Sequence, residues 1–95
     1  MLSFELNNKQ FHELQGLKFW LVEKSWLQER EPDNTADIHR AHETICFILQ
    51  KLDRLGVPFW VQNVVLKLQD NWRTASSIQL AYFLQDNNVT INFAA

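Results

Sequence analysis

Alternating apolar and polar positions mark both ends of the chain. Apolar residues occupy every second position of residues 2–6 and again of residues 89–93, a period of two that is typical of β-strands. Since the two segments are about equally long, we expect the ends to meet as a short two-stranded β-ribbon. A lone ribbon is only marginally stable, so it must pack on the rest of the fold or continue into a second chain. Frayed arms at both ends are the alternative.

A long helix is expected over residues 8–30. Asn7 is a suitable N-cap, and Gln10 follows three residues later, as in a capping box. The apolar residues of this helix cover most of its circumference instead of forming one stripe. They are Phe11, Leu14, Leu17, Phe19, Trp20, Leu21, Val22, Trp26 and Leu27. Helices that are apolar nearly all round are usually sandwiched between other elements or shared with another chain.

The cleanest helical pattern lies in residues 35–55. It follows a break at Pro32, and any of residues 33–35 can act as its N-cap. Gly56 stands at the position where helices stop in a left-handed turn, and Val57 can supply the apolar contact of a Schellman motif. The stripe recurs at three- and four-residue steps, with Leu49 widening it: Ile38, Ala41, Ile45, Ile48, Leu52 and Leu55. We expect Ile38, Ile45, Ile48 and Leu52 to face the core.

Two further helices are expected in the last third of the chain. Pro58 is suited to the first turn of a third helix. The face predicted for that helix comprises Val61, Val64, Val65, Leu68 and Trp72. The pattern loses its phase before Ser76, which with Gln79 makes a second possible capping box, so a fourth helix is expected over residues 77–86. A single bent helix over residues 58–86 is the alternative.

These elements predict a mainly α fold: a bundle of three to four helices in one domain, residues 1–95, with a short β-ribbon from the chain ends. Apolar residues make up 46% of the chain and aromatic residues 13%. Burial of this much apolar surface can offset the entropy cost of ordering the chain, which argues against a disordered protein. There are only two Gly and two Pro, which argues against long irregular loops.

The charge distribution bounds the class of partner. The formal net charge is −2, and residues 58–95 carry only two basic and two acidic side chains. A generic nucleic-acid binder needs Lys and Arg against phosphates, and no run of apolar residues approaches the roughly 20 that span a bilayer. We therefore expect neither nucleic acid nor membrane as partner. The single Cys46 and the absence of a secretory signal at the start favour the cytoplasm.

No catalytic, metal or cofactor site is expected. His39 and His42 are three residues apart on one helix, but a dependable metal site needs three or four ligands. We expect His39 to be solvated and His42 to border the core. Cys46 lies in an apolar run without a basic neighbour, and we expect it to be a buried structural residue.

A helix-turn-helix interpretation finds little support. Residues 77–84 loosely match the first helix of such a unit, but neither Lys nor Arg occurs after Arg73 and only seven residues follow Asn88. A recognition helix of that kind would lack both the length and the charge for contacts with phosphates and base edges. For these reasons, a nucleic-acid-associated regulator ranks only second among the hypotheses for the function.

The aromatic side chains support the first hypothesis for the function: the chain is a non-enzymatic protein–protein interaction module that serves as an adaptor, regulator or inhibitor. Trp residues are enriched at binding hot spots, although they could equally fill a small core. Both apply if the core closes only in a homodimer. The predicted partner-binding residues are Phe19, Trp20, Trp26, Leu27, Trp60 and Trp72. A helical domain that binds a small molecule or a metal is a third, more distant hypothesis.

Overall fold

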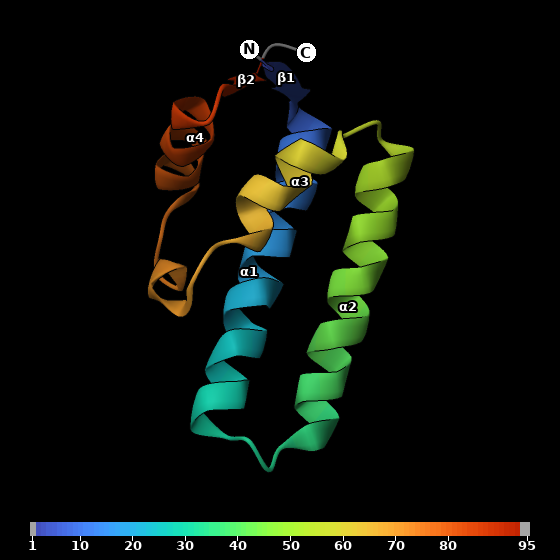
Figure 1. Cartoon of the computed structure of the whole chain (residues 1–95), viewed down its shortest axis with the longest axis vertical. Coiled ribbons are helices and arrows are strands. Elements are labelled where there is room, and N and C mark those ends of the chain that lie inside the picture. Colours follow the sequence, from blue (N-terminus) through green and yellow to red (C-terminus); the bar gives the residue numbers. More distant parts are fainter. Residues whose placement is uncertain (1, 94–95) are drawn as a thin grey trace.

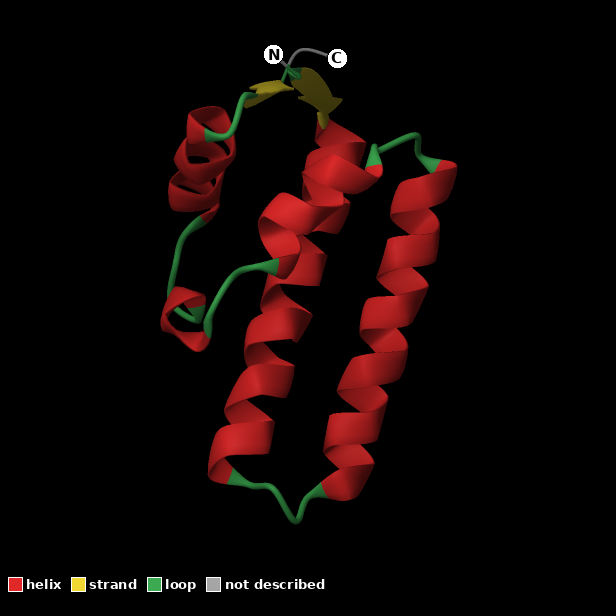
Figure 2. Cartoon of the chain, in the orientation of Figure 1, coloured by secondary structure: helices red, strands yellow, loops and turns green. Residues whose placement is uncertain are grey.

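A helical hairpin runs the length of the molecule, and the rest of the chain covers one side of its first helix (Figure 1). The computed structural model describes residues 2–93 and measures 42 × 26 × 24 Å. In chain order the elements are β1 (Phe4–Asn7), α1 (Asn8–Arg30), α2 (Thr35–Arg54), α3 (Phe59–Leu66), the 3-10 turn η1 (Asp70–Trp72), α4 (Ser77–Asp86) and β2 (Val89–Asn92). The two strands lie together at one end of the bundle (Figure 2). The mainly α fold with a terminal β-ribbon is confirmed.

Side chains cap the helices as their sequences predict. At the start of α1, the Asn7 side chain accepts a hydrogen bond from the Gln10 N–H at 2.8 Å, and the Gln10 side chain accepts one from the Asn7 N–H at 2.9 Å. Ser76 and Gln79 form the same reciprocal pair before α4, at 3.2 and 2.7 Å. Among the three candidates before α2, Asn34 is the N-cap. Each reciprocal pair satisfies two backbone donors that a helix start leaves open.

The end of α2 is a Schellman motif. Gly56 has a φ of +80°, the left-handed conformation in which glycine carries no steric penalty. The Val57 N–H donates to the Leu52 carbonyl at 3.0 Å, and the Gly56 N–H donates to the Asp53 carbonyl at 3.1 Å. Val57 and Leu52 both belong to the core, so the motif also has its apolar contact. Pro58 is the N-cap of α3 and stands one position before its first turn.

The third helix is shorter than its apolar pattern suggests. It ends at Leu66, so Leu68 and Trp72 lie outside it, and the face predicted to reach Trp72 is wrong. The valines that fill this helix favour strands over helices, and the chain leaves the helix once their packing ends. Trp72 instead belongs to η1. The division into α3 and α4 is confirmed, and the single bent helix over residues 58–86 is wrong.

The two strands pair in parallel. Phe4 lies opposite Val89 and Leu6 opposite Ile91, while the side-chain amide of Asn8 donates to the Phe93 carbonyl at 2.7 Å. The ribbon is offset from the sequence alternation at both ends, since Leu2 lies outside β1 and Phe93 outside β2. The predicted pairing of the ends is confirmed. The path of the helices returns the chain to the end where it began, which brings the two terminal segments together (Figure 1).

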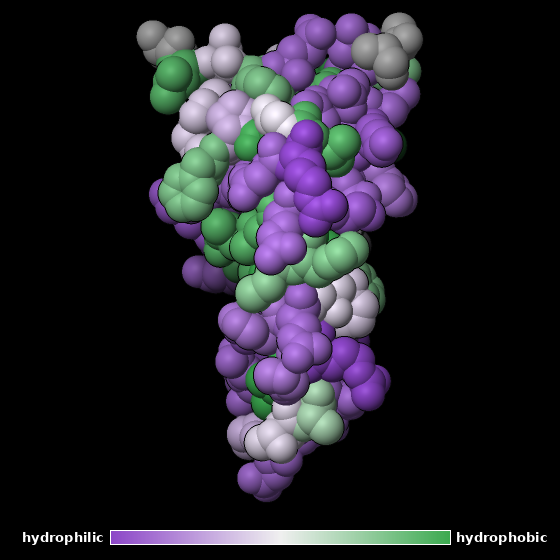
Figure 3. Space-filling model, turned by 90° about the vertical axis from the view of Figure 1, so that its right-hand side faces the viewer, coloured by the Kyte–Doolittle hydropathy of each residue, from purple (hydrophilic) through white to green (hydrophobic). Residues whose placement is uncertain are grey.

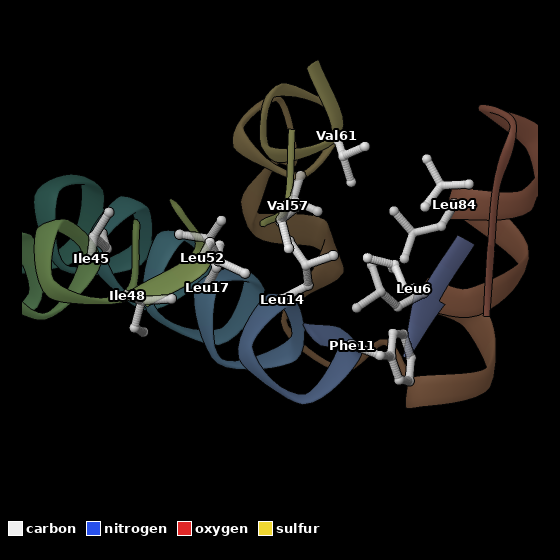
Figure 4. Packing of buried hydrophobic residues seen from close by; sticks show 13 residues of the cluster. Leu6, Phe11, Leu14, Leu17, Ile45, Ile48, Leu52, Val57, Val61 and Leu84 are labelled. Carbon is white, nitrogen blue, oxygen red and sulfur yellow. The ribbon is translucent and has the colours of Figure 1, made fainter. Parts of the chain in front are cut away.

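One core joins the hairpin, α3, α4 and the ribbon (Figure 4). Its members include the predicted Ile45, Ile48 and Leu52 of α2. Ile38 is only half-buried and lies outside this core, so its assignment to the core is wrong. The reason is that the hairpin extends beyond α3 and α4 at the end where Ile38 lies, and fewer elements are available there to cover it (Figure 1). The outer side of α2 is mostly hydrophilic (Figure 3).

Candidate functional site

The strongest candidate site is an open groove between α1 and α4, closed at one end by β2. Its volume is about 780 Å³, within the range of roughly 300–1,000 Å³ that is typical of ligand pockets. The lining residues come from all three elements and the residue that follows β2: Asn8, Phe11, His12, Gln15, Ser77, Ile78, Ala81, Tyr82, Gln85, Thr90, Ile91 and Phe93. We call this the α1–α4 groove.

The lining of the groove is an even mixture of apolar and polar side chains. Half of its residues are aliphatic or aromatic, and the rest are polar side chains without Asp, Glu, Lys or Arg. Charged residues make up 21% of the whole chain, so the lining differs in composition from the chain as a whole. The groove is therefore suited to an apolar partner with a few hydrogen-bonding groups at its margin.

Three large apolar side chains project beside this hollow. Ile78, Tyr82 and Phe93 are exposed by 68%, 65% and 63%. Ile78 and Tyr82 are one helical turn apart on α4 and lie on the same face of the helix. The Phe93 ring meets the buried ring of Phe11 edge to face, with centroids 6.0 Å apart. The lining of the groove thus includes three exposed apolar side chains.

Local structure fixes both walls of the groove. The capping box of Ser76 sets where α4 begins and therefore which residues face outward. Asn8, in the first turn of α1, holds the end of β2 through the Phe93 carbonyl. Phe11 is only 5% exposed and anchors this wall to the core. Since these contacts lie within the folded chain, the groove needs no partner to take its shape.

A second, smaller hollow of about 300 Å³ contains three of the predicted partner-binding residues. Phe19, Trp20 and Leu27 line it together with Glu23, Asp37 and Arg40. Phe19 is 54% exposed and packs edge to face on Trp20, with ring centroids 5.3 Å apart. Leu27 is buried and can only form the floor. This hollow is lined partly by charged residues, in contrast to the α1–α4 groove.

The other predicted partner-binding residues lie elsewhere and connect elements of the fold. The Arg73 guanidinium lies over the Trp26 ring at 4.6 Å and also pairs with Glu23, with 3.4 Å between Nη1 and Oε2. The Trp72 ring packs against Phe83 at 4.8 Å. Trp60 packs against the core. The structure therefore does not bring the six predicted residues together into one surface.

The histidines and the cysteine of α2 are exposed. His39 pairs with Glu43, with 2.8 Å between Nε2 and Oε1, and is solvated as expected. His42 contacts the Lys24 ammonium at 3.0 Å through Nδ1, and its Nε2 lies 3.7 Å from the Cys46 Sγ. Cys46 is an exposed free thiol, so the buried position expected for it is wrong, as is the border position expected for His42. His42 directly follows the buried Ala41, and Cys46 directly follows the buried Ile45. Each therefore points about 100° further round the helix than its buried neighbour.

Within residues 2–93, no group of three or more His, Cys, Asp or Glu side chains is arranged to hold a metal ion. In the same part of the chain, no helix has the length and apolar content needed to cross a membrane.

The surroundings of Lys18 shift the pKa of its side chain. Its ammonium donates to the Ala75 carbonyl, where the segment after η1 crosses α1. Burial lowers the pKa of Lys18 below its ordinary value of 10.5, because the charged form loses water. This contact holds the loop before α4 against α1 and helps to set the far wall of the groove.

The sequence analysis did not assign Ile78, Tyr82, Phe93 or Phe11 to a site. Six of the ten residues of α4 are apolar, so a periodic pattern alone cannot say which of them face outward. The signal that was available is the combination of an apolar helix and the absence of charge after Arg73 until Asp86. The chain matches no known protein family, no curated protein and no solved structure.

Proposed function

We propose that this chain is a non-enzymatic protein–protein interaction module, an adaptor, regulator or inhibitor that acts as a homodimer and docks through the α1–α4 groove. The observation that supports it is the lining of the groove, which lacks Asp, Glu, Lys and Arg and includes three large apolar side chains that are each exposed by about two thirds. Single exposed apolar residues are ordinary, but a contiguous uncharged apolar surface is typical of an interaction site.

The composition of the groove supports a protein partner. The centres of protein interfaces are enriched in aromatic residues and depleted of charged ones, with polar residues at the rim. The groove has aromatic residues at Phe11, Tyr82 and Phe93, and uncharged polar residues such as Gln15 and Gln85 complete its lining. The lining contains His12 and Tyr82, but neither carboxylate, lysine nor cysteine accompanies them there, so it lacks the usual partners of a catalytic histidine.

The test is a comparison of capture and self-association between groove variants and a matched control. The double variant Ile78→Gln, Tyr82→Gln removes the two exposed apolar side chains that α4 contributes to the lining. Phe59→Gln removes an equally exposed side chain, 69% exposed, from α3, outside the groove. Each tagged protein is used to capture partners from the native host, and its mass is measured by sedimentation over a range of concentrations.

The proposal predicts that proteins captured by the wild type are retained by Phe59→Gln and lost by the double variant. It also predicts that self-association is affected in the same order. Capture and self-association that are equal in all three proteins would contradict docking through the groove. Circular dichroism serves as the control for folding, and the exposure of all three positions predicts unchanged spectra.

A further inference from the structure

The segment that joins α3 to α4 lies against α1 without contributing a buried residue to the core. Between the buried Val65 and the buried Leu80, every residue is half-buried or exposed. Leu68 is the last residue before α4 that packs against the core. The part that follows contains η1 and ends at the N-cap of α4. We call this part, residues 69–76, the strap.

The backbone of the strap is bonded mainly to itself. Three of its N–H groups donate to the carbonyl three positions earlier, each at 3.0 Å: those of Trp72, Arg73 and Ala75. Within residues 2–93, no backbone hydrogen bond joins the strap to α1. Segments with local hydrogen bonds and few buried contacts are the ones that open at a low cost in free energy while the rest of a protein stays folded.

Side chains hold the strap to α1, and each of their contacts is weak. The Arg73 guanidinium lies over the Trp26 ring at 4.6 Å, and it pairs with Glu23 at 3.4 Å. The Arg73 and Glu23 side chains are 45% and 22% exposed, and such contacts near the surface add little to stability. The Lys18 ammonium donates to the Ala75 carbonyl, but burial of the charge opposes that contact.

We propose that the strap detaches from α1 as a unit while the helical hairpin, α3 and α4 stay folded. Detachment breaks the contacts of Arg73 and Lys18 with their partners and uncovers the face of the Trp26 ring that the guanidinium covers. The strap is thus a conformational device that controls access to an aromatic side chain of α1. It opens whatever the α1–α4 groove binds, so the proposal is independent of the proposed function.

The elements on either side of the strap are held independently of it. Leu80 and Leu84 of α4 are fully buried, as are Leu17 of α1 and Leu52 of α2. The Trp72 ring packs against Phe83, which ties the strap to α4 and not to α1. Loss of the contacts with α1 therefore leaves the core intact.

Amide hydrogen exchange of the whole protein, followed by NMR, tests the proposal. The protection of the hydrogen-bonded strap amides is compared with that of amides in the middle of α2. Arg73→Gln removes the guanidinium from Trp26 and Glu23. Arg40→Gln is the matched control, because it removes an exposed arginine of α2. Ile45→Val trims a buried side chain of α2 and destabilises the hairpin without touching the strap.

We expect Ile45→Val to lower the protection of the α2 amides by between about twofold and tenfold. The same variant should leave the protection of the strap amides unchanged, because the strap opens without unfolding of the hairpin. Arg73→Gln should lower the protection of the strap amides by about fivefold, and Arg40→Gln should leave it unchanged.

Three results would overturn the proposal. The first is an equal loss of protection in the strap and in α2 on Ile45→Val, which would mean that the strap opens only when the whole protein unfolds. The second is an effect of Arg73→Gln on the strap amides that is no larger than that of Arg40→Gln. The third is exchange of the strap amides at free-peptide rates in the wild type, because the strap would then have no closed state.

Discussion

The side chain of Gln10 joins the start of α1 to the end of α2 through the carbonyl of Leu55. Its Nε2 donates to that carbonyl at 2.8 Å, while its Oε1 accepts the Asn7 N–H of the capping box. Gln10 is only 8% exposed, so both contacts are made largely away from water. One amide thus caps one helix and satisfies the terminal carbonyl of another.

Replacement of Gln10 by Glu separates these two contacts. A carboxylate can still accept the Asn7 N–H, but it cannot donate to Leu55 and faces its carbonyl oxygen instead. We expect a loss of about 1–3 kcal/mol in the free energy of unfolding, measured by urea titration. Gln79→Glu is the matched control, because Gln79 occupies the same position in an exposed capping box. Equal effects of the two replacements would show that the contact with Leu55 contributes nothing.

Truncation of the α2 stripe should depend on position. Leu52 is fully buried, and Leu52→Ala is expected to cost about 2–5 kcal/mol because it leaves a cavity in the core. Ile38 is half-buried at the open end of the hairpin, so Ile38→Ala should cost less than half as much. Urea titration of both variants measures the difference. A change of about a few tenths of a kcal/mol for Leu52→Ala, far below the cost of a core cavity, would contradict the core as described.

The two glycines should respond to alanine with opposite signs. Gly16 lies inside α1, and a Cβ there would meet the Ile48 Cδ1 at 3.7 Å, an ordinary contact. Gly16→Ala is therefore expected to stabilise the protein by about 0.5–1 kcal/mol. At Gly56 a Cβ finds open space, but the φ of +80° is strained for alanine. Gly56→Ala should cost about 1–2 kcal/mol. Thermal melts of the two variants should shift in opposite directions, and a shared direction would refute one of these backbone assignments.

The lowered pKa of Lys18 predicts a stability that rises with pH. Between that lowered pKa and the ordinary value of 10.5, the unfolded chain binds the proton more tightly than the folded one, so raising the pH favours the folded state. At neutral pH both states carry the proton, and the cost of the half-buried charge is fully present. The stability of the wild type relative to Lys18→Met should therefore be flat near neutral pH and increase as the pH approaches 10.5. A decrease over that window would reverse the sign of the pKa shift.

The exposed thiol of Cys46 should react in the native protein. A disulfide reagent such as DTNB is expected to modify one thiol per chain in buffer without denaturant, within a few-fold of the rate in urea. Circular dichroism after modification should show an unchanged helix content, because the side chain points away from the core. A thiol that reacts only after unfolding would restore the buried position that the sequence pattern indicates.

Local signals in the sequence predict the ends of the helices well. Asn7 with Gln10, Ser76 with Gln79, and Gly56 with Val57 each specify their geometry through neighbours a few residues away, and the structure forms all three. Such motifs need no knowledge of the tertiary fold. The elements and the pairing of the chain ends follow from them and from the period of the apolar residues.

The features that the sequence could not predict depend on contacts between distant segments. Cys46 and Ile45 are neighbours in an apolar run, yet only Ile45 faces the core. Trp72 continues the apolar spacing of α3 but packs against Phe83 after the helix has ended. The α1–α4 groove likewise depends on how far apart two helices lie, which no periodic pattern encodes.

The parallel ribbon has a consequence for the order in which the protein can form during its synthesis. Leu6 is fully buried, and its ribbon partner is the strand that begins at Val89. The ribosome releases the chain from its N-terminus, so α1 and α2 can associate while β2 has yet to be made. Until β2 has been synthesised, β1 has no strand to pair with, and Leu6 is exposed to water or to a chaperone. Residues made later therefore complete the burial of residues made earlier, and a nascent chain that stops short of Val89 keeps a first strand without its pairing partner.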